Sequence, residues 1–449
     1  MSAVLDKENV FLTSFDRLER QWSVDSPPWV QRLRRAAMAH FVESGFPTTR
    51  DEEWRFTDVS PLVDVSFEPA RPPSELPSPE QLEEAASLPK ASRRIVFVNG
   101  HYQRDLSSGR AAAKGVLVGR LAEAIRTRRD LVEPHLGRHA GYQDQPFVAL
   151  NTAFLDDGAL VYLAPGTVVE EPIHVLYVWT ATDRASVAHP RNLIVAESHA
   201  EAQIVETYLG LGEDVSFTNV VTEIVLAPGA IVDHYKLQRE GREAFHMGTV
   251  QVQQQRESTF SSHLISLGGS LVRNETNTRL AGEGCRSTLN GLYMAAGRQH
   301  MDSRTRIDHE KPHCQSRELY KGILDDRAKG VFNGKIFVHQ DAQKTDAKQT
   351  NQTLLLSDRA QINTKPQLEI FADDVKCTHG ATVGQLDEEA LFYLRSRGIA
   401  HERARNLLVY AFTNEVVRSI RLEPIRAQLG QILLAARGLP ADTPIEETS

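Results

Sequence analysis

Between about residues 145 and 380 the chain consists of short segments in which apolar and polar residues alternate, with no long helical segment between them. Such alternation is typical of β-strands with one buried face. Residues 173–179 (IHVLYVW) and 248–253 (GTVQVQ) are two examples. This succession of strand-like segments without helices excludes a doubly wound α/β sheet, because that fold needs a helix between consecutive parallel strands.

Small residues in turn-like stretches recur along this segment and indicate repeated structural units. The spacing of five such markers is imperfect but recurring, with the longest interval between the third and the fourth; the markers are Ala230, Ser258, Gly284, Ala328 and Ala360. A chain that coils and stacks on itself buries such strands without helices. We therefore predict a mainly β fold with a parallel β-helix core, and a double-layer jelly roll is the alternative. The aromatic content of 7% and polar rows such as Gln251 and Gln253 favour stacked coils.

Both ends of the chain have helical character. Residues 29–41 place apolar side chains at helical spacing after two prolines, and a helical pattern returns from Asp387. Thr49 and Glu52 have the spacing of a capping box, which predicts a helix that begins there. The chain then divides into a mainly helical N-terminal region (1–144), the β-helix core (145–380) and a C-terminal helical region (381–449).

Charge, composition and missing motifs exclude several classes of protein. The formal net charge is -8 and no long basic run is present, which argues against nucleic-acid binding. Apolar runs such as residues 407–412 are too short to span a bilayer. The first residues do not have the pattern of a signal peptide, and three cysteines are too few for a disulfide framework. We therefore expect a cytoplasmic protein. There is no GxxxxGK[ST], CxxC, GxSxG or HExxH, so we expect no bound nucleotide and assign no catalytic or cofactor-binding residue.

Cys377 and His379 form the most informative candidate site. Residues 368–371 (LEIF) indicate an extended strand, on which residues two apart project from the same face. Gly380 follows directly, and we expect the chain to turn there. A thiolate beside an imidazole suits a soft metal or a sulfur intermediate. The alternative is that Cys377 is a small buried hydrophobe and His379 an inert neighbour.

A second, weaker concentration of metal-ligand types comprises Asp308, His309, His313 and Cys314. Pro312 makes a continuous helix unfavourable there, so His309 and His313 need not share a face. The alternative is that these are the polar residues of a turn. Cys285 lies in a turn-like segment, and we interpret it as structural.

Three blocks of sequence carry a family resemblance. They are residues 45–58 (GFPTTRDEEWRFTD), 321–335 continuing through 345–350 (TDAKQT), and 376–384 (KCTHGATVG) continuing through 391–399 (LFYLRSRGI). In these blocks the chain resembles the SufD-type members of the SufB/SufD family, scaffold subunits of the SUF iron–sulfur cluster assembly system. The blocks lie at both ends and in the middle, so the resemblance covers nearly the whole chain.

The resemblance implies a right-handed parallel β-helix between helical terminal regions, in a non-catalytic subunit that partners SufB and the ATPase SufC. ATP hydrolysis would belong to SufC, docked on the C-terminal helices at about residues 387–437. The Cys-x-His of the family falls on Cys377 and His379, at the SufB interface where a transient iron–sulfur cluster forms. SufB-like proteins carry a cysteine in the segment that here is 350–356 and has none, which favours the SufD type.

Two other functions stay open from the residues alone. One is a purely structural β-helix subunit whose Cys-x-His is inert. The other is a β-helix enzyme acting on carbohydrate, which would need a carboxylate pair or a basic residue in a groove. A homodimer of the isolated chain also stays open. The resemblance assigns no role to His309, His313 or Cys314.

Overall fold

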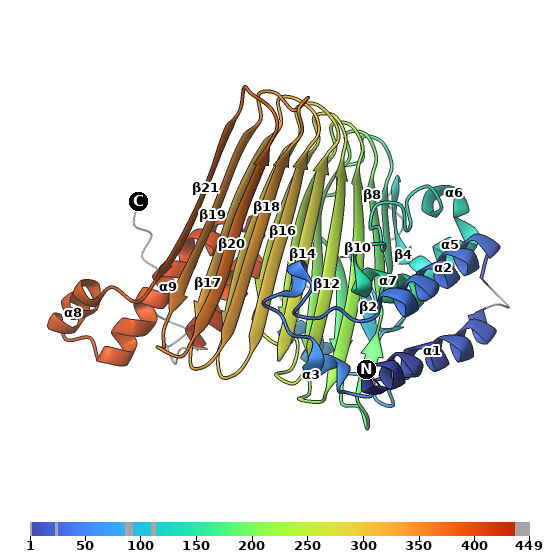
Figure 1. Cartoon of the computed structure of the whole chain (residues 1–449), viewed down its shortest axis with the longest axis horizontal. Coiled ribbons are helices and arrows are strands. Elements are labelled where there is room, and N and C mark those ends of the chain that lie inside the picture. The colour runs from blue at the N-terminus through green and yellow to red at the C-terminus, as the bar shows by residue number, and fades with distance from the viewer. Residues whose placement is uncertain (1, 23–25, 86–92, 109–113, 436–449) are drawn as a thin grey trace.

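The computed structural model describes residues 2–22, 26–85, 93–108 and 114–435. Its centre is a parallel β-solenoid, drawn from green to orange in Figure 1. From Arg191 to Gly384 the long strands alternate between two sheets, and each pairs with the strand of the same sheet one coil further along. These pairings are all parallel, which confirms the β-helix prediction and excludes the jelly roll.

Each sheet contributes one long strand to every coil. The first sheet contains β5 (Ala159–Leu163), β8 (Arg191–Ala196), β10 (Ser216–Leu226), β12 (Phe245–Gln254), β14 (Leu271–Leu280), β16 (His300–His309), β18 (Lys329–Val338) and β20 (Gln361–Ile370). The second contains β6 (Ile173–Trp179), β9 (Glu201–Gly210), β11 (Ile231–Arg239), β13 (Thr259–Ser266), β15 (Arg286–Ala295), β17 (Gln315–Leu324), β19 (Asp346–Leu355) and β21 (Lys376–Gly384). Phe245 pairs with Leu271, whereas Lys329 pairs with Gln361, a partner further along the chain, so the coils differ slightly in length.

The turn markers seen in the sequence lie at two different corners of the solenoid. Those at 230, 258 and 284 precede strands of the second sheet, whereas Ala328 and Ala360 precede strands of the first sheet. The long interval between Gly284 and Ala328 is therefore a change of corner and not a longer coil. Cys285, which follows Gly284, is equivalent to Cys314 in the next coil, directly before β17.

Apolar side chains at alternate strand positions fill the solenoid. From β8 to β18, one row of register partners in the first sheet consists of β-branched residues: Ile194, Ile224, Val252, Thr278, Ile307 and Ile336. All six are buried. Branched side chains pack well on a pleated surface, and complete burial of one such apolar side chain stabilises the fold by about 1.5–3 kcal/mol.

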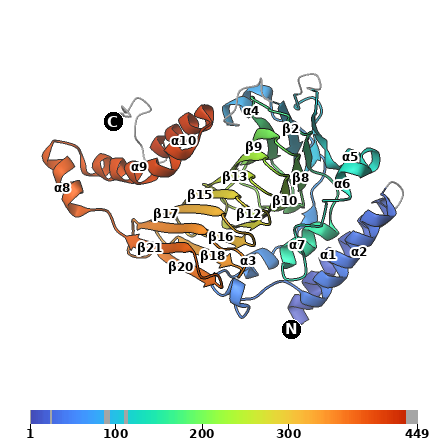
Figure 2. The same cartoon turned by 90° about the horizontal axis from the view of Figure 1, so that it is seen from above.

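Helices cover the outer faces of both sheets (Figure 2). The outer face of the first sheet packs against an aromatic cluster that includes Phe41, Trp54 and Phe147. This cluster comes from α1 (Ser2–Trp22), α2 (Pro28–Ser44), η1 (Glu52–Trp54), α3 (Ser60–Val63) and α7 (Pro146–Ala153). The outer face of the second sheet packs against α9 (His401–Ser419) and α10 (Glu423–Ala435), which follow α8 (Glu388–Ser396). No helix in the described part of the chain is long and apolar enough to cross a membrane.

The N-terminal region also contributes strands to the beginning of the solenoid. β2 (Arg93–Val98) pairs in parallel with β6, and β4 (Val116–Arg120) pairs antiparallel with β5. The remaining elements of this region are β1 (Glu68–Pro69), α4 (Pro79–Ala85), β3 (His101–Tyr102), α5 (Leu121–Thr127) and α6 (Arg129–Val132). β1 pairs with β7 (Ser186–Ala188), a short strand of the first sheet that also pairs with β10. The predicted helix at the capping box is absent: Glu52–Trp54 is a single 3-10 turn, and Asp51 Oδ2 accepts the backbone N–H of Thr48 at 2.7 Å.

A buried ion pair fastens this region to the solenoid. Arg191 and Glu223 have fully buried side chains, and Arg191 Nη2 donates to Glu223 Oε2 at 2.6 Å. The Glu223 carboxylate also accepts three backbone N–H groups of the turn at residues 137–140, at 2.8, 3.0 and 3.0 Å. Arg191 Nη1 donates to two side-chain oxygens of α7, each at 3.1 Å.

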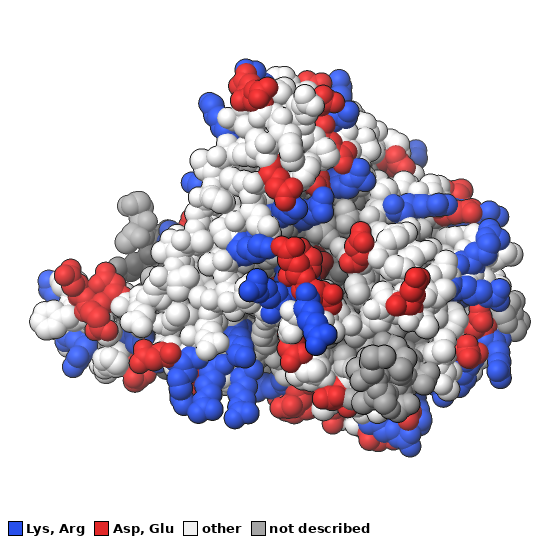
Figure 3. All heavy atoms as spheres, in the orientation of Figure 1, with Lys and Arg blue, Asp and Glu red and all other residues white. Residues whose placement is uncertain are grey.

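The far end of the solenoid is open. β20 and β21 are the last strands of their sheets, and none of their residues is buried. In the preceding strands, β18 and β19, at least half of the residues are buried. In Figure 1, β21 forms the edge of the solenoid and α8 lies to one side of it. Figure 3 shows basic and acidic residues interspersed over much of the face in view.

Candidate functional site

Cys377 and His379 lie on β21, at the open end of the solenoid. The Cα of Cys377 pairs with that of Ala347, and the Cα of His379 pairs with that of Gln349. Ala347 and Gln349 are buried interior residues. Because side chains in a parallel ladder keep the same face from strand to strand, both candidate ligands project from the interior face of the last coil. The extended backbone predicted from the sequence therefore places thiol and imidazole on one face.

The strand does not turn at Gly380, contrary to the expectation from the sequence. Gly380 is paired with Thr350, and β21 continues to Gly384. A Cβ at this position would contact nothing within 4 Å. Gly380 thus leaves open space beside His379 on a straight edge strand.

Cys377 and His379 differ in their surroundings. Cys377 is partly buried and packs against an apolar cluster that includes Ile336, Val338 and Ala347. Burial raises the pKa of the Cys377 thiol, and the backbone N–H of Ala347 opposes this only in part. His379 is exposed. In the isolated chain the donor pair therefore consists of a neutral thiol and an accessible imidazole.

Exposed apolar side chains also lie on the last two strands of the open end. Ile370 and Phe371, at the end of β20, are 39% and 58% exposed, and Val383 on β21 is 45% exposed. An apolar area beside an unpaired strand edge is typical of a surface that another protein covers.

The second group of candidate ligands does not converge. His309 is buried, its Nε2 is 3.0 Å from Ser316 Oγ, and burial lowers its pKa to about 4. His313 is exposed in a turn with φ of 60°. Cys314 faces the solenoid interior, where its thiol donates to the carbonyl of Gly282 at 3.3 Å. No group of three or more potential metal ligands of the His, Cys, Asp or Glu type occurs within the described residues.

Cys285 and Cys314 are stacked at the same corner of consecutive coils. Both are completely buried, and both thiols donate to the carbonyl of Gly282. In the coils before them the same corner holds Ala230 and Ser258, each also directly before a strand of the second sheet. The corner takes a small side chain in each of these coils, which agrees with a structural interpretation of Cys285.

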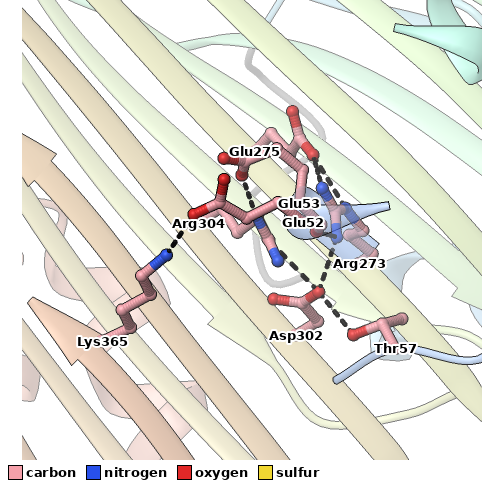
Figure 4. A network of polar contacts seen from close by, with 8 residues as sticks. All are labelled: Glu52, Glu53, Thr57, Arg273, Glu275, Asp302, Arg304 and Lys365. Atoms are coloured by element: carbon pink, nitrogen blue, oxygen red, sulfur yellow. Dashed lines mark hydrogen bonds and ion pairs between the residues drawn. The ribbon is translucent and has the colours of Figure 1, made fainter. Parts of the chain in front are cut away.

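The outer face of the first sheet carries a polar network that sequence reasoning did not anticipate (Figure 4). Asp302 is completely buried and accepts from Arg273 at 2.9 Å, Arg304 at 3.4 Å and Thr57 at 2.7 Å. Burial alone would raise the pKa of Asp302, but the two guanidinium groups, the hydrogen bond from Thr57 and the nearby His300 together lower it. Arg273 also lies over the ring of Trp54 at 3.6 Å. The first of the resembling blocks, residues 45–58, thus fastens the N-terminal region to the sheet.

Two further ion pairs extend this attachment. Glu53 pairs with Arg304, and Glu52 pairs with Lys365 at 2.9 Å on β20. A cavity of about 210 Å³ lies beside the network, between Phe147 and the sheet. Its basic residues all have acidic partners, so it offers no excess positive charge to an anionic ligand.

Comparisons with known proteins agree with the geometry. A family model described as the SUF system FeS cluster assembly SufBD core domain matches residues 178–412, and one for the SufBD protein N-terminal region matches residues 5–175. The chain is 35% identical to an iron–sulfur cluster assembly SufBD family protein of Synechocystis, over 86% of each chain. It is 32% identical to the iron–sulfur cluster assembly protein SufD of Escherichia coli, over 96% of this chain and 97% of that one. Identity to SufD of Bacillus subtilis is 26%, over 96% and 98%.

Proposed function

The chain belongs to the SufBD family of the SUF iron–sulfur cluster assembly system, and from this premise we propose that it is a non-catalytic scaffold subunit that partners SufB and the ATPase SufC. The observation that carries the proposal is the position of Cys377 and His379. They lie on one face of an exposed edge strand, at the open end of the solenoid.

The open end suits a second solenoid as partner. The outer edges of β20 and β21 have no strand neighbour within the described chain, so their free backbone groups can pair with another strand. The apolar residues around Cys377 and His379 would be covered in the same contact. We assign this contact to SufB, and this assignment puts both candidate ligands in the interface.

The donor pair fits iron and sulfide as cargo. A cysteine thiolate and an imidazole nitrogen are both established iron ligands. Burial keeps the Cys377 thiol protonated in the isolated chain, and a ligand must lose that proton to bind metal. No cysteine lies in residues 350–356, so further thiolates must come from the partner. We infer that the site is incomplete until SufB is bound.

The C-terminal helices are proposed to dock SufC. On α8, Phe392 is 72% exposed and Tyr393 is 57% exposed, beside the buried Leu391 that holds the helix. Neighbouring exposed aromatic side chains on a projecting helix are typical of a docking site. α9 and α10 instead cover the outer face of the second sheet, in a buried cluster that includes Val416 of α9, Leu429 of α10, and Tyr235 and Leu237 of the sheet.

The site is tested in the complex co-expressed with SufB and SufC. His379→Ala should leave the complex assembled but lower its iron and sulfide content, and Cys377→Ser should act in the same direction. Thr378→Ala is the matched control, because this residue lies between the two on the opposite face of β21. Wild-type iron and sulfide content in both site variants would show that the Cys-x-His is inert.

The docking helix needs a separate test. Removal of α9 and α10 would uncover the second sheet, so single substitutions on α8 are sharper. Phe392→Asp should abolish co-purification of SufC and leave SufB bound, whereas Arg395→Asp on the same helix should have little effect. Retention of SufC by Phe392→Asp would place its docking site elsewhere.

A further inference from the structure

The interior row of side chains that ends at His379 is polar. Register places His379 beside Gln349 and Gln349 beside Glu318, in three successive coils. Gln349 is 1% exposed and Glu318 is 3% exposed. One coil further in, the same row is occupied by Leu289. Polar side chains therefore replace this leucine in the last coils before the open end.

Two acceptors in this row are left without a partner among the described residues: Gln349 Oε1, which adjoins the last coil, and Glu318 Oε1, one coil further in. Gln349 Nε2 donates to Glu318 Oε2 at 2.7 Å, which fixes the amide. Gln349 Oε1 is buried and has no hydrogen-bond partner among the described residues. Such an atom costs roughly 1–3 kcal/mol, and a side chain like Leu289 would avoid this cost. An unsatisfied buried acceptor beside the proposed site indicates a donor that arrives when the site is completed.

We propose that Gln349 is a positioning residue for His379: its Oε1 accepts one ring N–H, and the other ring nitrogen then faces the iron. Glu318 holds the Gln349 amide in the orientation that presents this oxygen. The inference rests on the function proposed above and adds two residues of this chain to its site.

The spacing of the solenoid permits this contact. Neighbouring strands are about 4.8 Å apart, so the amide of one coil reaches the imidazole of the next. Histidines that bind metal almost always donate their second N–H to a carboxylate or a carbonyl, which fixes tautomer and ring orientation. In the isolated chain His379 is exposed and Gln349 Oε1 is unpaired, so the hydrogen bond forms as SufB covers the open end.

The chain offers a matched control on the same strand. Asn351 is also an interior amide of β19 that is 1% exposed, and it donates to the carbonyl of Tyr320 at 3.3 Å. Its register partner in the last coil is Ala381, which carries no ligand. Replacing Asn351 therefore removes a buried amide without touching His379.

The experiment measures the affinity of the purified complex with SufB and SufC for Fe²⁺ alone, without oxygen. Gln349→Leu should weaken iron binding by about tenfold or more, as loss of such a supporting hydrogen bond does elsewhere. Complex yield and thermal midpoint should stay near wild type. Asn351→Leu should bind iron as wild type does. In a His379→Ala background, Gln349→Leu should cause no further loss, because it acts through the ring.

A swap of the two polar residues gives a rescue. In the double variant Glu318→Gln/Gln349→Glu, the carboxylate at 349 can accept the ring N–H of His379. The amide at 318 can donate to this carboxylate and hold it in place, so the affinity for iron should return to within a few-fold of wild type. If His379→Ala weakens iron binding and Gln349→Leu does not, or if Asn351→Leu weakens it equally, this inference is overturned and the proposed function stands. If His379→Ala itself has no effect, the proposed site falls as well.

Discussion

The buried pair of Arg191 and Glu223 should respond unequally to removal of its two partners. Glu223→Gln leaves a buried guanidinium that cannot lose its proton and that faces only neutral acceptors, namely two oxygens of α7 at 3.1 Å and the single oxygen of the new amide. Loss of one partner of a buried ion pair costs about 3–5 kcal/mol. Arg191→Met leaves a carboxylate that keeps three backbone N–H donors, at 2.8 to 3.0 Å. We therefore expect Arg191→Met to cost only about 1–3 kcal/mol.

Urea unfolding followed by circular dichroism measures both costs, as shifts in the free energy of the first cooperative transition. The pH dependence supplies a second check. Burial would raise the pKa of Glu223, but Arg191 and the backbone donors lower it below the value in the unfolded chain. Its contribution is therefore present above the unfolded pKa of about 4.3 and is lost as pH falls through the folded pKa. The difference between wild type and Glu223→Gln should shrink accordingly in acid. A larger cost for Arg191→Met than for Glu223→Gln at pH 7 would refute the reasoning.

Three further predictions concern the network, the interior acid and nucleotide. Thr57→Val removes one donor to Asp302 and should lower stability by about 1–3 kcal/mol in the same urea assay, with exposed Thr378→Val as control. Burial raises the pKa of Glu318 to about 7, so the folded chain keeps a proton that the unfolded chain releases above about 4.3. Stability should therefore fall between these two pH values, by about 4 kcal/mol in total, and Glu318→Gln should remove this slope; an unchanged slope would place the titration elsewhere. The isolated chain should bind no ATP in calorimetry, and a micromolar Kd would contradict this.

The course of the solenoid could be predicted because strand alternation and small corner residues leave a repeating trace in the sequence. Ala230 and Ser258 mark one corner, and Gly284 lies one residue before the equivalent position, Cys285. The spacing of the markers is irregular because Ala328 and Ala360 lie at the other corner. Residue type alone does not distinguish the two corners.

Local signals failed where long-range contacts decide the structure. Thr49 and Glu52 have a capping-box spacing, yet this segment lies across the outer face of the first sheet, where Glu52 and Glu53 pair with Lys365 and Arg304. Gly380 suggested a turn, but pairing with β19 keeps the strand extended.

Only part of the candidate site, Cys377 and His379, could be predicted from the sequence. Cys377 and His379 are separated by a single residue, and their shared face follows from strand geometry. Gln349 precedes His379 by a whole coil and Glu318 precedes Gln349 by another, so their adjacency depends on the coil length. No spacing rule predicts that length, because it varies from coil to coil.

The unequal ends of the solenoid limit how many molecules can join. One end finishes in β3 and β4, antiparallel strands of 2 and 5 residues, which are poor templates for a further strand. The other end offers strands of 10 and 9 residues. A solenoid with exposed strand edges at one end only can bind one partner through strand pairing. Two such solenoids form a closed pair and cannot extend into a fibre. In the assembly proposed above, this asymmetry would limit the chain to one partner solenoid, bound at the open end.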